Sequence, residues 1–438
     1  MRDLMLFGAM LVFFALAVGN TFIAYMLWGW AGLAAVNYYV FGFMQTQPIV
    51  QVFAIITLVL IVMGKDDERQ PFALNRTSSI YLVYTAQALV CATLAYPDLA
   101  RNWELAVNLI KTLLYCVLMP MVLTSRYRIH AFVVMLAIAT GLHGLLDGLK
   151  FIANAGRHVA MGIGKFGDNN HFALVLVMSL PLLIYISRFV SSRLIKLGFM
   201  GVTVLTVLAV VATHSRGGLA CMVAVALWFI ATSKRKMAGL LLVSVSAVLV
   251  VAMAPADWTE RMNTMRDAGA DNSFMQRVSA WKVSSAIALE NPVFGGGFHA
   301  VQARPVWERF QNAPSLLPTM QGMDFNIARA AHSIYFEVMG DGGFLGLIIF
   351  LTVFLNAIFT ARTVIREAIA LGPEFEWARN LAEMLLLTII AYLAGGALLS
   401  AAYFEMPYIV CMLLEVLKLH LRRERRLTDS NGARKAVA

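Results

Sequence analysis

One short segment of the sequence combines a histidine, two carboxylates and four glycines. Residues 331–346 read Ala-His-Ser-Ile-Tyr-Phe-Glu-Val-Met-Gly-Asp-Gly-Gly-Phe-Leu-Gly, so the candidate acid–base groups are His332, Glu337 and Asp341. A histidine that is neutral near pH 7 is a natural general base, and we expect the carboxylates to orient or charge-balance its imidazole. An apolar run, residues 344–361, follows directly and is long enough to cross a bilayer. The segment therefore predicts proton transfer at the edge of a membrane.

Two arginines are candidates for binding an anion. Arg216 stands between two apolar runs in Thr-His-Ser-Arg-Gly-Gly, where its guanidinium and the backbone N–H groups of a helix start would converge. Arg277 lies one turn before Trp281 in an expected helix that begins near Ser273 and stops at Asn291. We predict that both arginines are catalytic, together with His332. The alternative is that both side chains contact only lipid headgroups.

A third polar segment, residues 150–171, is rich in basic and amide side chains that suit sugar or phosphate. An ordinary solvated loop is the alternative for this segment. The predicted substrate-binding residues are Arg157, Lys165, Asn169, Asn170, Trp281, Tyr335 and Glu337. No H-E-x-x-H motif, phosphate-binding loop or D-x-D pair accompanies these residues, so we predict that the protein uses no metal, nucleotide or other cofactor.

The elements that must position these residues are membrane helices. The chain of 438 residues is 60% hydrophobic and 14% charged, with a mean hydropathy of +0.73, whereas soluble domains are about 25% charged. Its formal charge of +10 comes from short basic clusters between apolar runs, so topology and anionic lipid explain the charge better than nucleic acid does. The four cysteines lie inside apolar runs without C-x-x-C spacing, which disfavours disulfides and metal sites.

The apolar runs predict an all-α fold, a polytopic transmembrane helical bundle of 12 or 13 spans with one long loop that contains helices. The count depends on whether residues 1–39 form one span or two. The runs cover residues 4–18, 21–39, 49–63, 79–96, 104–124, 130–150, 171–187, 197–212, 217–231, 237–253, 344–361, 383–400 and 403–420. We expect four parts: N-terminal transmembrane helices (1–253), a long outer loop or lid with a surface helix (254–343), C-terminal transmembrane helices (344–420) and a basic cytoplasmic tail (421–438).

The distribution of lysine and arginine between the connecting loops predicts the orientation of the bundle. The richer set, which we assign to the cytoplasm, includes residues 65–76, 126–128, 188–196, 234–236, 362–379 and 422–426. The other set, residues 97–103, 151–170, 213–216 and 254–343 with the turn near 402, has fewer basic residues for its length. All the segments with candidate chemistry belong to this second, outer set.

Three motifs occur in a fixed order on this outer side. They are Ser215-Arg216-Gly217-Gly218, then Arg277-x-x-x-Trp281 leading to Asn291-Pro292-x-x-Gly295-x-Gly297, and then His332-Ser333-x-Tyr335-x-Glu337-x-x-Gly340-x-x-Gly343-x-x-Gly346. In combination they resemble the O-antigen ligase and O-antigen polymerase superfamily. The opening Met1-Arg2-Asp3 and the stretch Gly167-Asp168-Asn169-Asn170 are also similar to its exosortase-A-associated O-glycosylation ligases.

The resemblance implies a GT-C-like fold in the bacterial inner membrane and a metal-independent, inverting transfer on the periplasmic face. Its donor would be a glycan on undecaprenyl diphosphate, and its acceptor a sugar hydroxyl of lipid A-core, as in lipopolysaccharide biosynthesis. Polymerases commonly have a second arginine motif in another periplasmic loop, and its absence from this sequence favours a ligase. An O-antigen polymerase, a protein O-oligosaccharyltransferase and a lipid-linked glycan transporter remain as alternatives. The partners would be these two substrates and membrane lipid, with no nucleic acid.

Overall fold

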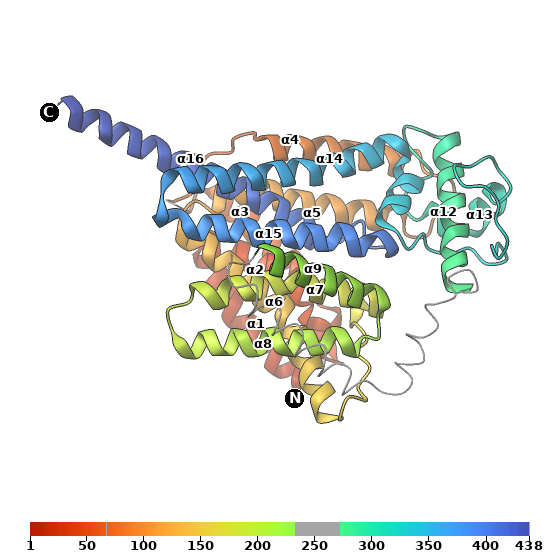
Figure 1. Cartoon of the computed structure of the whole chain (residues 1–438), viewed down its shortest axis with the longest axis horizontal. Coiled ribbons are helices and arrows are strands. Elements are labelled where there is room, and N and C mark those ends of the chain that lie inside the picture. The colour runs from red at the N-terminus through yellow and green to blue at the C-terminus, as the bar shows by residue number, and fades with distance from the viewer. Residues whose placement is uncertain (67, 233–271, 438) are drawn as a thin grey trace.

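The computed structural model describes residues 1–66, 68–232 and 272–437, and this part of the chain consists of helices and loops without strands. The helices of the bundle are α1 (Arg2–Gly19), α2 (Thr21–Ala34), α3 (Ile49–Met63), α4 (Arg76–Thr93), α5 (Asn102–Val122), α6 (Arg126–Ala153), α7 (Asn169–Phe189), α8 (Arg193–Ala212), α9 (Arg216–Thr232), α14 (Ile334–Leu371), α15 (Glu376–Gly395) and α16 (Glu405–Val437). Two further helices, α12 (Asn272–Glu290) and α13 (Arg304–Phe310), lie at one end of the bundle (Figure 1). Short 3-10 helices are η1 (Val36–Tyr39), η2 (Phe43–Thr46), η3 (Gly164–Phe166), η5 (Ala300–Gln302), η6 (Pro373–Phe375) and η7 (Gly396–Leu398).

Seven helical segments of the described chain are long and apolar enough to cross a membrane, so this is a multi-pass membrane protein. They are Arg2–Gly19, Asn102–Val122, Arg126–Ala153, Asn169–Phe189, Arg193–Ala212, Ile334–Leu371 and Pro373–Leu398. Residues 1–34 form two helices that meet at Asn20, whose side chain accepts a hydrogen bond from the backbone N of Ile23 at 3.1 Å and so caps α2. The apolar run at 237–253 lies outside the described residues, and the total of 12 or 13 spans stays a prediction.

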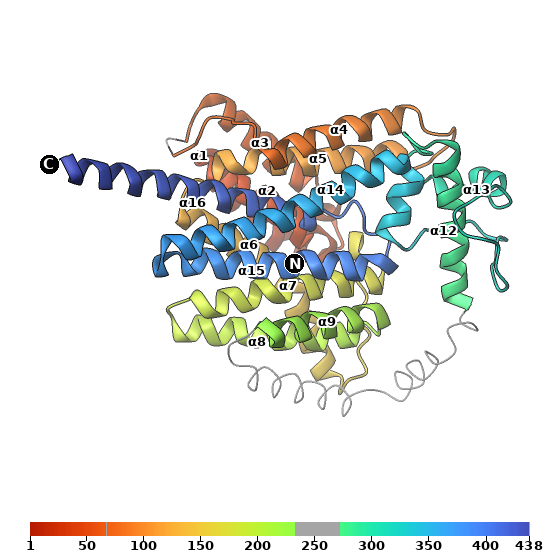
Figure 2. The same cartoon turned by 45° about the horizontal axis from the view of Figure 1, so that its top comes forward.

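The connections between helices gather at two opposite ends of the bundle (Figures 1 and 2). We call the end that carries α12 and α13 the α12 end; it includes residues 94–101, 154–168, 213–215 and 396–404. The opposite end is called the tail end, because α16 leaves the bundle there, and it includes residues 64–75, 123–125, 190–192 and 372–375. The described loops that the sequence predicts as basic are therefore at the tail end, and the segments with candidate chemistry are at the α12 end.

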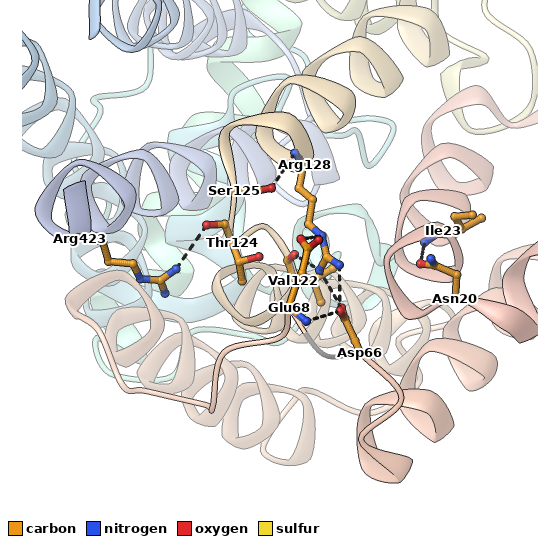
Figure 3. Close-up of polar contacts among 9 residues, drawn as sticks. All are labelled: Asn20, Ile23, Asp66, Glu68, Val122, Thr124, Ser125, Arg128 and Arg423. Carbon is orange, nitrogen blue, oxygen red and sulfur yellow. Dashed lines mark hydrogen bonds and ion pairs between the residues drawn. The ribbon is translucent and has the colours of Figure 1, made fainter. Parts of the chain in front are cut away.

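Arg128 links two neighbouring connections at the tail end (Figure 3). Its guanidinium donates to Asp66 Oδ2 at 2.7 Å and to Glu68 Oε2 at 2.9 Å, and its NH1 group also donates to the carbonyl of Val122 at 3.0 Å. Only 9% of the Arg128 side chain is exposed. The sequence uses Arg128 as one of the basic residues that predict the orientation of the bundle. In the structure, Arg128 also connects the α3–α4 connection to the start of α6.

The helix α12 crosses the end of the bundle at a steep angle and packs on α14 (Figure 2). A second hydrophobic cluster forms where α12, η5 and α13 meet, around Trp307, whose side chain is fully buried. The polar face of α12 binds the segment 311–326, because Ser279 Oγ accepts from Asp324 N at 3.0 Å and Lys282 Nζ donates to Gln311 O at 2.9 Å. The expected surface helix is thus covered by chain on the side that faces away from the bundle.

A kink divides α14 at Gly343, whose φ of 67° and ψ of −169° are not helical. Residues 291–297 dock into this kink: Leu345 N donates to Pro292 O at 3.2 Å, and Gly297 N donates to Asp341 O at 3.0 Å. A Cβ atom on Gly295 would lie 2.5 Å from Gly343 N, so only glycine allows this approach. The expected boundary between the long loop and the C-terminal helices, at residues 343 and 344, falls at this kink.

Candidate active site

His332 lies at the α12 end, two residues before α14 begins, and its backbone is held from two sides. Its N–H donates to Ser400 Oγ at 2.8 Å, and the carbonyl of the preceding Ala331 accepts from Trp281 Nε1 at 2.7 Å. Its φ of 45° is left-handed, a conformation that costs energy in a residue other than glycine. The backbone of His332 is therefore fixed by α12 and by the α15–α16 connection, and its imidazole is half-buried.

The surroundings of His332 favour its neutral form. Burial lowers the pKa of the imidazole below its ordinary value of 6.5, and the charges of Arg277 and Arg329 lower it further. The charge of Asp168 acts in the opposite direction and raises the pKa of His332. An imidazole that stays neutral at pH 7 can accept a proton, which is what a general base needs. Arg277, on the first turns of α12, is thus an electrostatic neighbour of His332.

The N-termini of α7 and α9 are joined at the same end. Asp168 caps α7, since its Oδ1 accepts from the backbone N–H groups of Asn170 and His171, each at 2.9 Å. Asn169 Nδ2 donates to Thr213 O at 2.9 Å. These contacts attach the α6–α7 connection, which includes the carboxylate that acts on His332, to the turn that precedes Arg216.

Ser215 completes the junction between the two helices. Its hydroxyl donates to Asn170 Oδ1 at 2.7 Å and accepts from the backbone N–H of Gly218 at 3.0 Å, so it caps α9. Arg216 is the first residue of α9 and is half-buried. Two adjacent helix N-termini carry partial positive charge, and Arg216 adds a full one, which suits an anionic ligand.

Trp281 is part of the packing that supports His332. Its indole stacks on Phe336 with ring centroids 5.0 Å apart and an interplanar angle of 6°, while Phe274 meets the ring edge-on at 5.9 Å. The indole N–H is bonded to Ala331. The sequence predicts that Trp281 supports a sugar ring or a lipid; the structure gives the side chain two aromatic neighbours and a backbone acceptor within the protein.

The polar residues on the first turns of α14 contact α15 and the α15–α16 connection. Tyr335 Oη donates to Leu393 O at 2.8 Å, near the end of α15. Glu337 is buried, and its Oε2 accepts from the backbone N of Ala402 at 3.1 Å. Asp341 Oδ2 accepts from Tyr403 Oη at 2.9 Å. The sequence predicts that these two carboxylates orient or balance the imidazole, whereas the carboxylate whose charge raises the pKa of His332 is Asp168.

The remaining predicted residues belong to the α6–α7 connection. Arg157 is exposed, and next to it His158 Nε2 lies 2.9 Å from Asp147 Oδ1. Asp147 Oδ1 also accepts from Lys150 Nζ at 3.0 Å. Lys165 lies in η3, and its side chain is outside the described part of the structure. The binding roles of Arg157 and Lys165 stay predictions.

Sequence reasoning assigned no role in the site to three contributors. Arg329 and Asp168 act on the charge of His332, and Ser400 binds its backbone. Arg329 stands only three residues before His332, so its position in the sequence was an available signal. Ser400 carries no comparable signal, because it comes from a different connection and meets His332 only through the packing of α14, α15 and α16.

Comparison with known protein families gives two matches. Residues 201–351 match a family model described as O-Antigen ligase, and this stretch includes Arg216, Arg277 and His332. Residues 1–191 match a family of unknown function (DUF5935). No curated protein matches the chain.

Proposed function

Because the chain belongs to the O-antigen ligase superfamily, we propose that it is a glycosyltransferase that moves a glycan from undecaprenyl diphosphate to a sugar hydroxyl of lipid A-core. We place the reaction at the periplasmic face of the bacterial inner membrane, where the α12 end would lie and the basic tail end would face the cytoplasm. We further propose a GT-C-like fold and an inverting, metal-independent mechanism. This assignment makes the protein an O-antigen ligase of lipopolysaccharide biosynthesis.

The observation that carries the proposal is that a histidine and two arginines lie at one end of a membrane protein. Arg277 acts electrostatically on His332, as does Asp168. The turn that precedes Arg216 is tied to the residues after Asp168 by the hydrogen bond from Ser215 to Asn170 at 2.7 Å. These interactions relate residues of α7, α9, α12 and the segment before α14. Such a site offers positive charge for a diphosphate and a neutral imidazole for a hydroxyl proton.

The proposed reaction is a single displacement. The acceptor hydroxyl oxygen attacks the anomeric carbon of the donor glycan and forms the new glycosidic bond. The bond between that carbon and the diphosphate oxygen breaks, and its electron pair leaves with the diphosphate. The hydroxyl proton passes to the neutral imidazole of His332. Arg216 and Arg277 stabilise the charge on the leaving diphosphate, and attack opposite to the leaving group inverts the anomeric configuration.

The test is a reconstituted transfer assay with purified donor. The full chain in liposomes receives carrier-linked glycan together with lipid A-core, a second carrier-linked glycan or an acceptor protein, each in a separate reaction. Product on lipid A-core supports the ligase. Product only on the second carrier-linked glycan identifies a polymerase, and product only on protein identifies an oligosaccharyltransferase. Movement of glycan across the bilayer without any new glycosidic bond identifies a transporter.

His332→Ala tests the role of the base in the same assay. General-base catalysis contributes about 10²–10⁴-fold, so we expect the rate to fall by at least about two orders of magnitude while donor affinity persists. The anomeric configuration of the wild-type product, measured by NMR, tests the single displacement. A retained configuration indicates a covalent glycosyl-enzyme instead, and normal transfer by the variant at saturating donor removes His332 from the role of base.

A further inference from the structure

The segment that carries His332 also carries an arginine whose hydrogen bonding is incomplete. Arg329 NH2 lies 3.4 Å from Asp324 Oδ2, and 29% of the arginine side chain is exposed. Its Nε atom is buried and has no hydrogen-bond partner. Buried donors are normally bonded, so this guanidinium makes fewer hydrogen bonds than its donors allow.

The contact between Arg329 and Asp324 is a loose one for an ion pair. Arg128 and Asp66 of the same chain approach to 2.7 Å, and so do Arg101 and Glu104. Charge-assisted hydrogen bonds of this type are about 2.7–2.9 Å long. Asp324 Oδ1 meanwhile accepts from the backbone N of Asn326 at 3.0 Å. A long, half-exposed pair of this kind contributes little energy, so Arg329 can exchange Asp324 for another anion.

The backbone around Arg329 is held along α12, which carries Arg277. At one end of the segment, Asp324 N donates to Ser279 Oγ at 3.0 Å. At the other end, Ala331 O accepts from Trp281 Nε1 at 2.7 Å. Arg329 therefore lies between two attachment points on one helix and three residues before His332. Its charge, like that of Arg277, reaches the imidazole.

We propose that Arg329 binds a phosphate group of a substrate and that Asp324 holds its guanidinium when the phosphate is absent. This inference rests on the proposed function, because it assigns a substrate group to the same site. The phosphate belongs either to the diphosphate of the donor or to a phosphorylated sugar of the acceptor. The two residues then have opposite effects on substrate affinity. Arg329 strengthens binding of the phosphate, and Asp324 weakens it because its carboxylate competes with the phosphate for the guanidinium.

Steady-state kinetics of the reconstituted full-length protein test whether the two substitutions change a substrate KM in opposite directions. A lost charge-assisted hydrogen bond corresponds to roughly 10- to 150-fold in affinity, so Arg329→Ala raises one KM by about this factor. Asp324→Asn removes the competitor and lowers the same KM, by about 2- to 5-fold for a half-exposed ion pair. Donor KM is measured at saturating acceptor. Acceptor KM is measured with lipid A-core and with its enzymatically dephosphorylated form.

The substrate whose KM changes identifies the source of the phosphate. A change in donor KM assigns Arg329 to the diphosphate, and a change confined to phosphorylated lipid A-core assigns it to the acceptor. Arg101→Ala and Glu104→Gln are the matched controls, because this pair lies at the same end of the bundle and its side chains are 53% and 54% exposed. Both controls should leave each KM unchanged.

A binding measurement without chemistry separates this inference from the proposed function. Inorganic pyrophosphate should raise the melting temperature of the wild-type protein, raise it more for Asp324→Asn, and raise it less for Arg329→Ala. That pattern supports the inference even if no glycan transfer is found. Unchanged KM values and an unchanged pyrophosphate response in Arg329→Ala overturn it even if transfer is normal. An equal rise of KM in both variants also overturns it, since that result indicates a structural ion pair.

Discussion

The hydrogen bond from Trp281 to Ala331 allows a sharp test of how His332 is positioned. Trp281→Phe keeps a six-membered aromatic ring that can stack on Phe336 and removes the five-membered ring of the indole with its N–H, which donates at 2.7 Å. Ala331 is 1% exposed, so its carbonyl loses a donor where water has little access. Leaving a buried acceptor unsatisfied costs about 1–3 kcal/mol. If the conformation that positions His332 for catalysis is destabilised by this amount, the rate of transfer falls by roughly 5- to 150-fold.

The distribution of this loss between kcat and KM is the informative quantity. A residue that positions the base lowers kcat and leaves donor KM unchanged, whereas a residue that binds a sugar raises KM. We therefore expect Trp281→Phe to lower kcat at constant donor KM in the reconstituted transfer assay. Trp103→Phe is the control, because Trp103 is at the same end of the bundle and is 52% exposed. It should transfer at the wild-type rate.

Two results would refute this reasoning. Wild-type kcat in Trp281→Phe, in protein that melts at a lower temperature, would mean that the bond stabilises the fold without placing His332. A raised KM at unchanged kcat would mean that the indole contacts substrate, which is the role that the sequence predicts for Trp281. The second result would also require the ring to leave its stacked position against Phe336.

The remaining predictions concern pH, charge and metal. Neutral His332 is the proposed base and its pKa is held below 6.5 by burial and Arg277, so kcat/KM should rise with pH and have its acid midpoint below pH 6.5. Asp168→Asn retains a good helix cap but removes the charge that raises this pKa, so the midpoint should move to lower pH; a shift to higher pH would contradict the assignment. Arg216→Ala should lower the rate by about 10- to 100-fold or more, and Arg216→Lys should recover little of it because lysine lacks the planar fork; near-normal transfer by a well-folded Arg216→Ala would count against diphosphate binding. Excess chelator should leave transfer unchanged, since the sequence contains no metal motif on the outer side; loss of transfer that Mg²⁺ or Mn²⁺ restores would show that a metal is needed.

Hydropathy and helix caps made much of the bundle predictable. The run at 104–124 corresponds to α5 at Asn102–Val122, and the run at 171–187 to α7 at Asn169–Phe189. Helix α6, Arg126–Ala153, extends beyond its apolar run because its ends are polar. The division of residues 1–34 into two helices depends on the cap at Asn20, and hydropathy alone left it open.

Long-range pairing in the site could not be predicted. The spacing of Glu337 and Asp341 from His332 suggested that they serve the imidazole, but each is bonded to the α15–α16 connection. The spacing of residues along a helix predicts which face a carboxylate lies on. It does not predict which backbone N–H or hydroxyl of a distant segment will donate to that carboxylate. The same holds for Ser400, and for Trp281, whose packing against Phe336 depends on how α12 lies across α14. Residue types thus indicated the chemistry, and tertiary contacts decided the partners.

The docking of residues 291–297 into the kink of α14 has a consequence for the order of synthesis. Pro292 accepts its hydrogen bond from Leu345, a residue made later in the chain. The hydrogen-bond partners of His332 and Glu337 are Ser400 and Ala402, which are synthesised later still. A ribosome must therefore complete α15 and the turn after it before the backbone N–H of His332 and the carboxylate of Glu337 acquire their final partners. The site is among the last parts of the nascent chain to mature, and a chain that stops before Ser400 would keep its motifs but lack their anchors.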